Sequence, residues 1–202
     1  MDAVLYIHGK GGSADEAEHY RLLFPSCHVL GLDYTGTTPW DAGEEIRKAI
    51  AALKANYDRI SIIANSIGAF FSMYADIGDD VSHAFFISPI VDMEKLISDM
   101  LGFACVTEAE LREKETIETE FGEELSWEYL CFIRDHPIHW EVPTDILYGS
   151  EDHLTSIETI KSFADSHQAS LTIMEGGEHW FHTAEQMQFL DHWIKTRSEL
   201  SI

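Results

Sequence analysis

Apolar runs of five or six residues recur along the chain, and stretches with helical spacing separate them. Six runs have the character of buried strands, at 3–8, 27–32, 59–64, 84–88, 144–148 and 170–174. Such nearly continuous apolar runs are typical of parallel strands that helices cover on both faces. Between two of them, Ile46, Ile50 and Leu53 recur three or four positions apart. The alternation predicts an α/β fold with a mostly parallel sheet of about six strands.

Three of the expected helices begin with residues that cap helix N-termini. A Ser or Thr side chain can accept a hydrogen bond from the backbone at the helix start, and a Glu or Gln three residues on can return one. The chain offers Thr38 before Pro39 and Asp41, and the capping boxes Thr155–Glu158 and Thr183–Gln186. A shorter helix is expected at 13–23. These signals place helices between the predicted strands, as a doubly wound sheet requires.

The segment 92–140 breaks this alternation. Apolar residues at helical spacing from Met93 to Met100 predict one helix, and 108–124 is expected to form another. The sequence contains no internal repeat and no low-complexity linker. The chain 1–202 is therefore predicted to be a single domain with a helical insertion at 92–140. The acidic residues of this insertion are expected to form a solvated face.

A serine stands between a predicted strand and a predicted helix in the pentapeptide Ala64-Asn65-Ser66-Ile67-Gly68. A sharp strand-to-helix turn brings the positions two before and two after the serine against neighbouring backbone, so both must be small. Ala64 and Gly68 meet this requirement, although glycine is the usual residue at the first position. The pattern predicts a nucleophile elbow that lifts the Ser66 hydroxyl clear of the sheet. The alternative is a serine that is merely buried in such a turn.

An acid and a histidine follow two later strands. Asp152 comes three residues after Gly149, just past the strand 144–148, and His179 follows a glycine pair past the strand 170–174. Because parallel strands end at one edge of a sheet, we expect both side chains to lie near Ser66. Other residues could take these roles: His182 as the base, and Glu151 or Asp92 as the acid. His153 is expected to be exposed.

The chain order of serine, acid and histidine resembles that of the α/β-hydrolases. A first strand that ends in His8-Gly9 before a glycine-rich turn is also similar to the oxyanion loop of that family. The resemblance covers nearly the whole chain. It implies a reduced α/β-hydrolase fold, without the two leading antiparallel strands and with helices on both faces of the sheet. It also implies that 92–140 is a cap over the active site; the alternative is an extra helical layer away from the chemistry.

The resemblance assigns chemical roles to single residues. A serine hydroxyl needs a base to take its proton as it attacks, and this base would be His179. The carboxylate of Asp152 would hold one imidazole tautomer and stabilise the cation that forms. The backbone N–H groups of Lys10 and Ile67 would meet the oxyanion, and His8 would brace the loop. The residues expected to line the substrate pocket are Trp40, Trp127, Phe132, Leu154 and Trp180. The alternative for the aromatic residues at helical spacing is a place in the core.

Charge narrows the range of partners. Acidic residues number 36 against 13 basic ones, which gives a net charge of −23. Phosphate backbones and anionic membrane surfaces would be repelled, so we expect neither nucleic acid nor a membrane as partner. No apolar stretch is long enough to span a bilayer, and no signal peptide is visible. Cys27, Cys105 and Cys131 are widely spaced, which favours free thiols and a cytoplasmic location.

Metal and cofactor motifs are missing from the sequence. The pairs His136–His139 and His179–His182 lack the His-Glu-x-x-His form of a helical zinc site. Lys10 lies in a glycine-rich turn, but no Ser or Thr follows it, as it would in a phosphate-binding loop. We therefore expect no metal and no cofactor. The sequence does not indicate an oligomeric state.

Together these features predict a serine hydrolase that cleaves a carboxylic ester or a related acyl bond in a small molecule, through an acyl-enzyme. The same residues could serve an acyltransferase, because only the acceptor of the acyl group would differ. A different class of function is a non-enzymatic protein that uses the same fold to bind a small molecule or a partner. That alternative predicts a serine that does not react with a fluorophosphonate probe.

Overall fold

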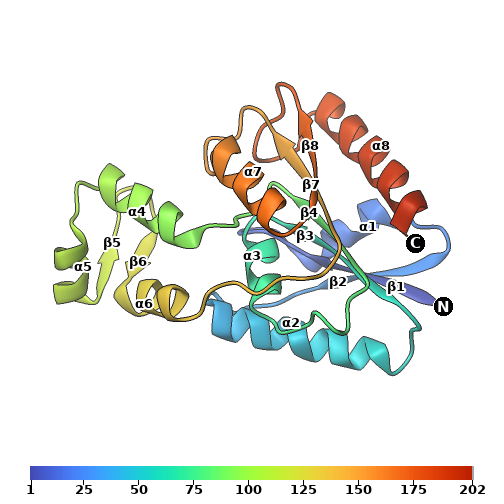
Figure 1. Cartoon of the computed structure of the whole chain (residues 1–202), viewed down its shortest axis with the longest axis horizontal. Coiled ribbons are helices and arrows are strands. Elements are labelled where there is room, and N and C mark those ends of the chain that lie inside the picture. The colour runs from blue at the N-terminus through green and yellow to red at the C-terminus, as the bar shows by residue number, and fades with distance from the viewer. Residues whose placement is uncertain (202) are drawn as a thin grey trace. The chain divides into compact units, whose positions relative to one another are not determined.

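The computed structural model describes residues 1–201, and the chain forms two compact units. The larger unit consists of 1–91 and 139–202, and the smaller one of 92–138 (Figure 1). The smaller unit lies within the segment 92–140 that the sequence analysis describes as an insertion, and the division of the chain into a single domain with an insertion stays a prediction. The role of this segment as a cap over the active site also stays a prediction.

A six-stranded sheet forms the centre of the larger unit. Its strand order is β2-β1-β3-β4-β7-β8, and every neighbouring pair is parallel. The strands are β1 (Asp2–Ile7), β2 (Cys27–Leu32), β3 (Ile60–Asn65), β4 (His83–Ile87), β7 (Thr144–Gly149) and β8 (Ser170–Met174). All six predicted strands are confirmed, each to within one residue at either end. A parallel sheet ends all its strands at one edge, which brings the loops after β1, β3, β7 and β8 together.

Helices cover both faces of this sheet (Figure 1). One face carries α1 (Ala17–Tyr20), preceded by the short 3₁₀ turn Ala14–Glu16, and α8 (Ala184–Ser201). The other carries α2 (Pro39–Lys54), α3 (Ile67–Met73) and α7 (Ile157–Ser166). Successive strand residues point to opposite faces, so alternate residues such as Phe85 and Ile87 pack under α8. The predicted α/β fold, a parallel sheet between two helical layers, is confirmed.

Two of the three predicted helix starts are correct. Thr38 caps α2 by accepting from Asp41 N at 3.2 Å, and Thr183 and Gln186 exchange hydrogen bonds at the start of α8. The box Thr155–Glu158 is wrong, because Ser156 caps α7 instead. Thr155 N bonds the carboxylate of Asp152, and the Thr155 carbonyl accepts from Tyr148. Thr155 therefore belongs to the loop after β7 and is not available as a cap.

The helix expected at 13–23 is shorter than predicted. A 3₁₀ turn at Ala14–Glu16 leads into a single α-helical turn that ends at Tyr20. Pro25 follows soon after, and a proline disfavours helical backbone in the residue before it. The segment still covers the sheet, because Tyr20 and Leu23 are buried in the core.

The smaller unit combines helices with a hairpin. Its helices are α4 (Met93–Phe103), α5 (Glu108–Lys114) and α6 (Trp127–Asp135), and β5 (Thr116–Glu118) pairs antiparallel with β6 (Glu124–Ser126). The helix predicted at 108–124 is therefore wrong beyond Lys114. Glu115 has a φ of 64°, which ends the helix, and the β-branched pair Thr116-Ile117 then favours a strand. Gly122, with a φ of 82°, supplies the turn.

Ion pairs link the three helices of the smaller unit. The guanidinium of Arg134, on α6, donates to Glu94 on α4 at 2.7 Å and to both oxygens of Glu108 on α5 at 2.7 and 2.9 Å. Leu111, Leu125 and Leu130 are buried within the unit. Of the glutamates expected to form a solvated face, Glu108 thus also links two helices through Arg134.

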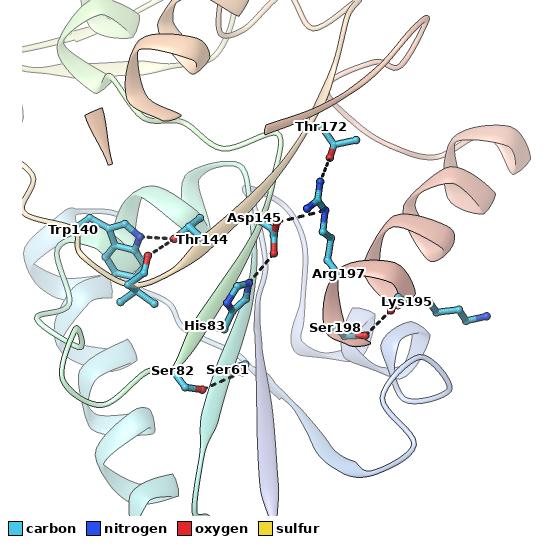
Figure 2. A network of polar contacts seen from close by, with 11 residues as sticks. Ser61, Ser82, His83, Trp140, Thr144, Asp145, Thr172, Lys195, Arg197 and Ser198 are labelled. Atoms are coloured by element: carbon cyan, nitrogen blue, oxygen red, sulfur yellow. Dashed lines mark hydrogen bonds and ion pairs between the residues drawn. The ribbon is translucent and has the colours of Figure 1, made fainter. Parts of the chain in front are cut away.

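A buried polar network anchors α8 on the sheet (Figure 2). His83 Nε2 lies 2.8 Å from Asp145 Oδ2, and Arg197 Nε lies 3.5 Å from Asp145 Oδ1. Arg197 also donates to Thr172 Oγ1 at 3.2 Å. His83 begins β4 and Asp145 is the second residue of β7, so this His–Asp pair lies at the amino ends of the strands. It joins β4, β7, β8 and α8, far from the loops that carry Ser66 and His179.

Candidate active site

Ser66 lies in a strained turn between β3 and α3. Its φ of 49° and ψ of −117° are rare for a residue with a side chain. A Cβ on Gly68 would come within 2.4 Å of the His8 carbonyl oxygen, and one on Gly9 within 3.3 Å of Ser66 Cβ. Only glycine fits at position 68, because real Cβ atoms do not approach backbone so closely. Ala64 is fully buried between β1 and β4, where a methyl group is accommodated.

Backbone hydrogen bonds hold this turn from both sides. Ser66 N donates to Ile87 O at 3.0 Å, at the end of β4. The Ser66 carbonyl accepts from Ile90 N and from Ala69 N, each at 3.2 Å. Because these bonds fix both peptide groups of Ser66, its unusual backbone conformation is part of the folded structure.

Asp152 lies on the loop after β7 with its side chain fully buried. Oδ1 accepts from Leu154 N at 2.8 Å and from Thr155 N at 3.2 Å. Oδ2 lies 2.7 Å from His179 Nδ1. Both oxygens are engaged, so a buried charge is compensated by backbone donors on one side and by an imidazole on the other.

His179 lies between this carboxylate and the serine. Its Nε2 is 2.9 Å from Ser66 Oγ, and 26% of its side chain is exposed. An ionised carboxylate can only accept, so Nδ1 carries the proton that faces Asp152. In the neutral ring, Nε2 then presents its lone pair to the Ser66 hydroxyl. This is the tautomer that can take a proton from Ser66.

The loops that carry Asp152 and His179 touch each other through two glycines. A Cβ on Gly149 would lie 2.3 Å from the carbonyl oxygen of Gly177. Two backbone bonds tie the loops: Glu151 N donates to Gly177 O at 2.8 Å, and Ser150 N to Met174 O at 3.0 Å. The glycines that flank the acid and the histidine thus allow a backbone contact that sets the distance between the two side chains.

The structure gives the alternative residues other surroundings. His182 Nδ1 bonds the carbonyl of Trp180 at 2.7 Å. Glu151 and His153 are exposed. Asp92 belongs to the smaller unit and caps α4, where its Oδ1 accepts from Lys95 N at 2.9 Å.

The two predicted oxyanion donors, the N–H groups of Ile67 and Lys10, belong to the helix that follows Ser66 and to the loop after β1. Ile67 is the first residue of α3, so its N–H has no helical carbonyl four residues before it. Lys10 follows Gly9, whose backbone packs against Ser66. His8 Nδ1 bonds the Gly9 carbonyl at 2.8 Å, its ring stacks on Tyr34, and the Tyr34 hydroxyl donates to the His8 carbonyl. The side chain of His8 and the ring and hydroxyl of Tyr34 thus both stabilise the loop after β1.

Of the predicted pocket residues, three belong to the larger unit. Trp180 is 74% exposed and its ring stacks on His182, while Leu154 is 38% exposed and Trp40 is half-buried. Trp127 and Phe132 lie on α6 in the smaller unit, where Arg112 covers Trp127 and His136 stacks on Phe132. That these five side chains line one pocket with Ser66 stays a prediction.

The sequence analysis missed a polar group behind the elbow. Asn65, directly before Ser66, donates to the Tyr6 hydroxyl at 2.8 Å, and Tyr6 in turn donates to Glu16. A signal was present, because Tyr6 and Asn65 are polar residues near the ends of largely apolar strands, at positions whose side chains point to the same face.

Among residues 1–201, no group of three or more His, Cys, Asp or Glu side chains is arranged to hold a metal ion. Among the helices described, none is long and apolar enough to cross a membrane.

Solved structures of other proteins resemble this chain in fold, whereas comparison of its sequence finds no match. No family model and no curated protein matches the sequence. Est1E from Butyrivibrio proteoclasticus aligns over 99% of this chain and 88% of its own, with a TM-score of 0.82 and 15% identity. Alpha/beta hydrolase domain-containing protein 10 from mouse covers 98% of this chain, and 89% of its own chain aligns, with a TM-score of 0.72 and 14% identity.

The esterase Pf2001 from Pyrococcus furiosus also aligns, over 98% of this chain and 79% of its own, with a TM-score of 0.62 and 16% identity. At such identities the likeness concerns the fold. The chain has the α/β-hydrolase fold, which confirms the resemblance noted in the sequence.

Proposed function

We propose that this protein is a serine hydrolase that cleaves a carboxylic ester or a related acyl bond through an acyl-enzyme. The observation that carries the proposal is the continuous hydrogen-bonded chain from Ser66 Oγ through the imidazole of His179 to the buried carboxylate of Asp152. The fold that the chain shares with esterases and other hydrolases supports the same class of reaction.

The first half of the reaction would acylate the serine. As Ser66 Oγ attacks the carbonyl carbon, His179 Nε2 takes its proton, and Asp152 stabilises the imidazolium that forms. The carbonyl oxygen becomes an oxyanion that the N–H groups of Ile67 and Lys10 would meet. Collapse of the tetrahedral intermediate expels the alkoxide, which takes the proton from His179, and leaves an ester on Ser66.

The second half repeats these steps with water. His179 takes a proton from a water molecule as it attacks the acyl-enzyme, and returns this proton to Ser66 Oγ as the carboxylic acid leaves. An alcohol or amine in place of the water would give acyl transfer. The same residues serve both outcomes, so the product formed in the presence of an added alcohol distinguishes them.

Apolar side chains beside the acid and the histidine favour an apolar acyl or alcohol group. Leu154 follows Asp152 by two residues, Trp180 follows His179 directly, and both are exposed. Est1E was solved with ferulic acid, an aromatic carboxylic acid. We therefore propose small esters with an apolar or aromatic acyl group as substrates.

A labelling experiment tests the proposal. A fluorophosphonate probe forms a covalent bond with an activated serine, so the wild-type protein should be labelled at Ser66 and should hydrolyse short p-nitrophenyl esters. Ser66→Ala should lose both labelling and hydrolysis. Ser166→Ala, on the exposed side of α7, is the matched control and should retain both. An unlabelled wild-type protein would support the non-enzymatic alternative.

A further inference from the structure

A second hydrogen-bonded chain lies behind the candidate active site. Asn65 Nδ2 donates to the Tyr6 hydroxyl at 2.8 Å, and the Tyr6 hydroxyl donates to the carboxylate of Glu16. Tyr6 lies on β1, Asn65 ends β3, and Glu16 ends the 3₁₀ turn before α1. The mechanism proposed above uses none of these side chains, although Tyr6 is only 1% exposed.

The direction of each bond follows from the chemistry of the groups. Burial raises the pKa of Tyr6 far above its ordinary value, helped by Tyr20 and by the hydrogen bond to Glu16, so the phenol keeps its proton. An ionised carboxylate can only accept, so this proton is given to Glu16. The Tyr6 oxygen is left to accept from the Asn65 amide. The orientation of that amide is therefore set by Tyr6.

The orientation of the Asn65 side chain depends on its hydrogen bond to Tyr6. In the part of the chain that the structure describes, Asn65 Oδ1 is buried without a hydrogen-bond partner. The bond from Nδ2 to Tyr6 thus holds the side chain of the residue directly before Ser66. The backbone of Asn65 also lies against the oxyanion loop, because a Cβ on Gly9 would be 3.5 Å from Asn65 O.

The other end of the chain reaches the far side of the same loop. A Cβ on Gly12 would lie 2.9 and 3.1 Å from the two carboxylate oxygens of Glu16. Gly12 N donates to Gly9 O at 3.1 Å and closes the loop. Glu16 therefore packs against one end of the turn 9–12, and Asn65 against the other.

We infer that Tyr6 is a positioning residue for the proposed reaction. Its hydroxyl links the residue before the nucleophile to the carboxylate that packs on the oxyanion loop, and so fixes Ser66 relative to the peptide between Gly9 and Lys10. Nucleophile and oxyanion donors must both be placed within about 0.5 Å for efficient attack. The inference rests on the proposed function, because it assigns Tyr6 a part in that reaction.

Tyr6→Phe tests this role, since it removes one hydroxyl and keeps the ring. We expect kcat for a p-nitrophenyl ester to fall about tenfold or more, because small misplacements of reacting groups are costly, while KM changes less than about twofold. Tyr20→Phe is the matched control. The ring of Tyr20 stacks on that of Tyr6 with centroids 5.2 Å apart, and both rings are buried in the same hydrophobic cluster. The control variant therefore also loses one phenolic hydroxyl from this cluster. Its kcat should stay within about twofold of wild type.

A double-mutant cycle separates positioning from general loss of stability. Asn65→Leu should lower kcat as Tyr6→Phe does. The double variant should be no slower than the slower single variant, because each substitution removes the same hydrogen bond between Asn65 and Tyr6. Should Tyr6→Phe fail to fold, Glu16 offers a second route, since this residue is exposed. Glu16→Leu should lower kcat at unchanged KM, and Glu16→Gln, which keeps an acceptor oxygen, should restore it.

Two results would overturn the inference. One is a Tyr6→Phe variant whose kcat and rate of fluorophosphonate labelling equal those of the wild type. The other is an equal loss of kcat in Tyr20→Phe, which would make the effect one of core packing. In both cases wild-type labelling at Ser66 would leave the proposed function standing. A wild-type protein that is not labelled would remove the proposed function and the inference together.

Discussion

Gly149→Ala is expected to separate the acid from the histidine of the candidate site. Its new Cβ would lie 2.3 Å from the carbonyl oxygen of Gly177 and 2.4 Å from the carbonyl carbon. Real Cβ atoms do not come closer than about 3.0 Å to such atoms, so the two loops must move apart by at least about 0.7 Å. No flexible side chain can yield, because both contacts are with backbone.

The size of the effect follows from this displacement. Overpacking of a tightly packed position costs about 1–3 kcal/mol of unfolding free energy, and each kcal/mol lowers the melting temperature by about 2–4 °C in a chain of this size. Asp152 and His179 are attached to the two loops that move. A misplacement approaching 1 Å can cost about 100-fold in rate, so we expect kcat to fall about 10- to 100-fold.

Melting curves and hydrolysis of a p-nitrophenyl ester, measured on the same preparations, check this prediction. Gly78→Ala is the matched control, because a Cβ at Gly78 meets no atom within 4 Å and the backbone φ is not in the left-handed region. The control should melt and turn over as the wild type does. If Gly149→Ala behaved like Gly78→Ala, the close approach of the two loops would not be what sets the geometry of the acid and the histidine.

A further prediction concerns the substrate. Trp180→Ala should lower kcat/KM for esters of aromatic or long acyl groups more than for acetate esters. It should change the unfolding free energy by no more than about 0.5 kcal/mol, since the side chain is 74% exposed, and an unchanged preference among substrates would remove Trp180 from the pocket.

The fold was predictable because its signals are local. Each strand of the sheet is a short run of apolar residues between polar turns, and the parallel arrangement follows from the helices between them. The positions of Ser66, Asp152 and His179 were also predictable, because each lies just past a strand of one parallel sheet. Their mutual distances could not be predicted, since these depend on contacts such as that of Gly149 with Gly177.

The errors arose where a short-range pattern had competing explanations. One helix is predicted over 108–124, but the β-branched pair Thr116-Ile117 and the turn at Gly122 produce a hairpin. Thr155 has the right spacing for a cap, but its N–H is already bound to Asp152 from an adjacent loop. The link between Tyr6 and Asn65 joins residues 59 positions apart, so the two polar positions were visible in the sequence but the bond between them was not.

The place of β8 at the end of the strand order has a consequence for how the protein loses activity. His179 follows this peripheral strand, whereas Ser66 follows β3 in the interior of the sheet. Peripheral strands open locally at a lower free energy than the whole domain. Local opening of β8 would therefore separate His179 from Ser66, and the contacts of Arg197 with Thr172 and Asp145 would oppose this opening. On warming, activity would then be lost before the protein unfolds globally. A substitution that strengthens the contacts of Arg197 would raise the temperature at which activity is lost without changing the melting temperature.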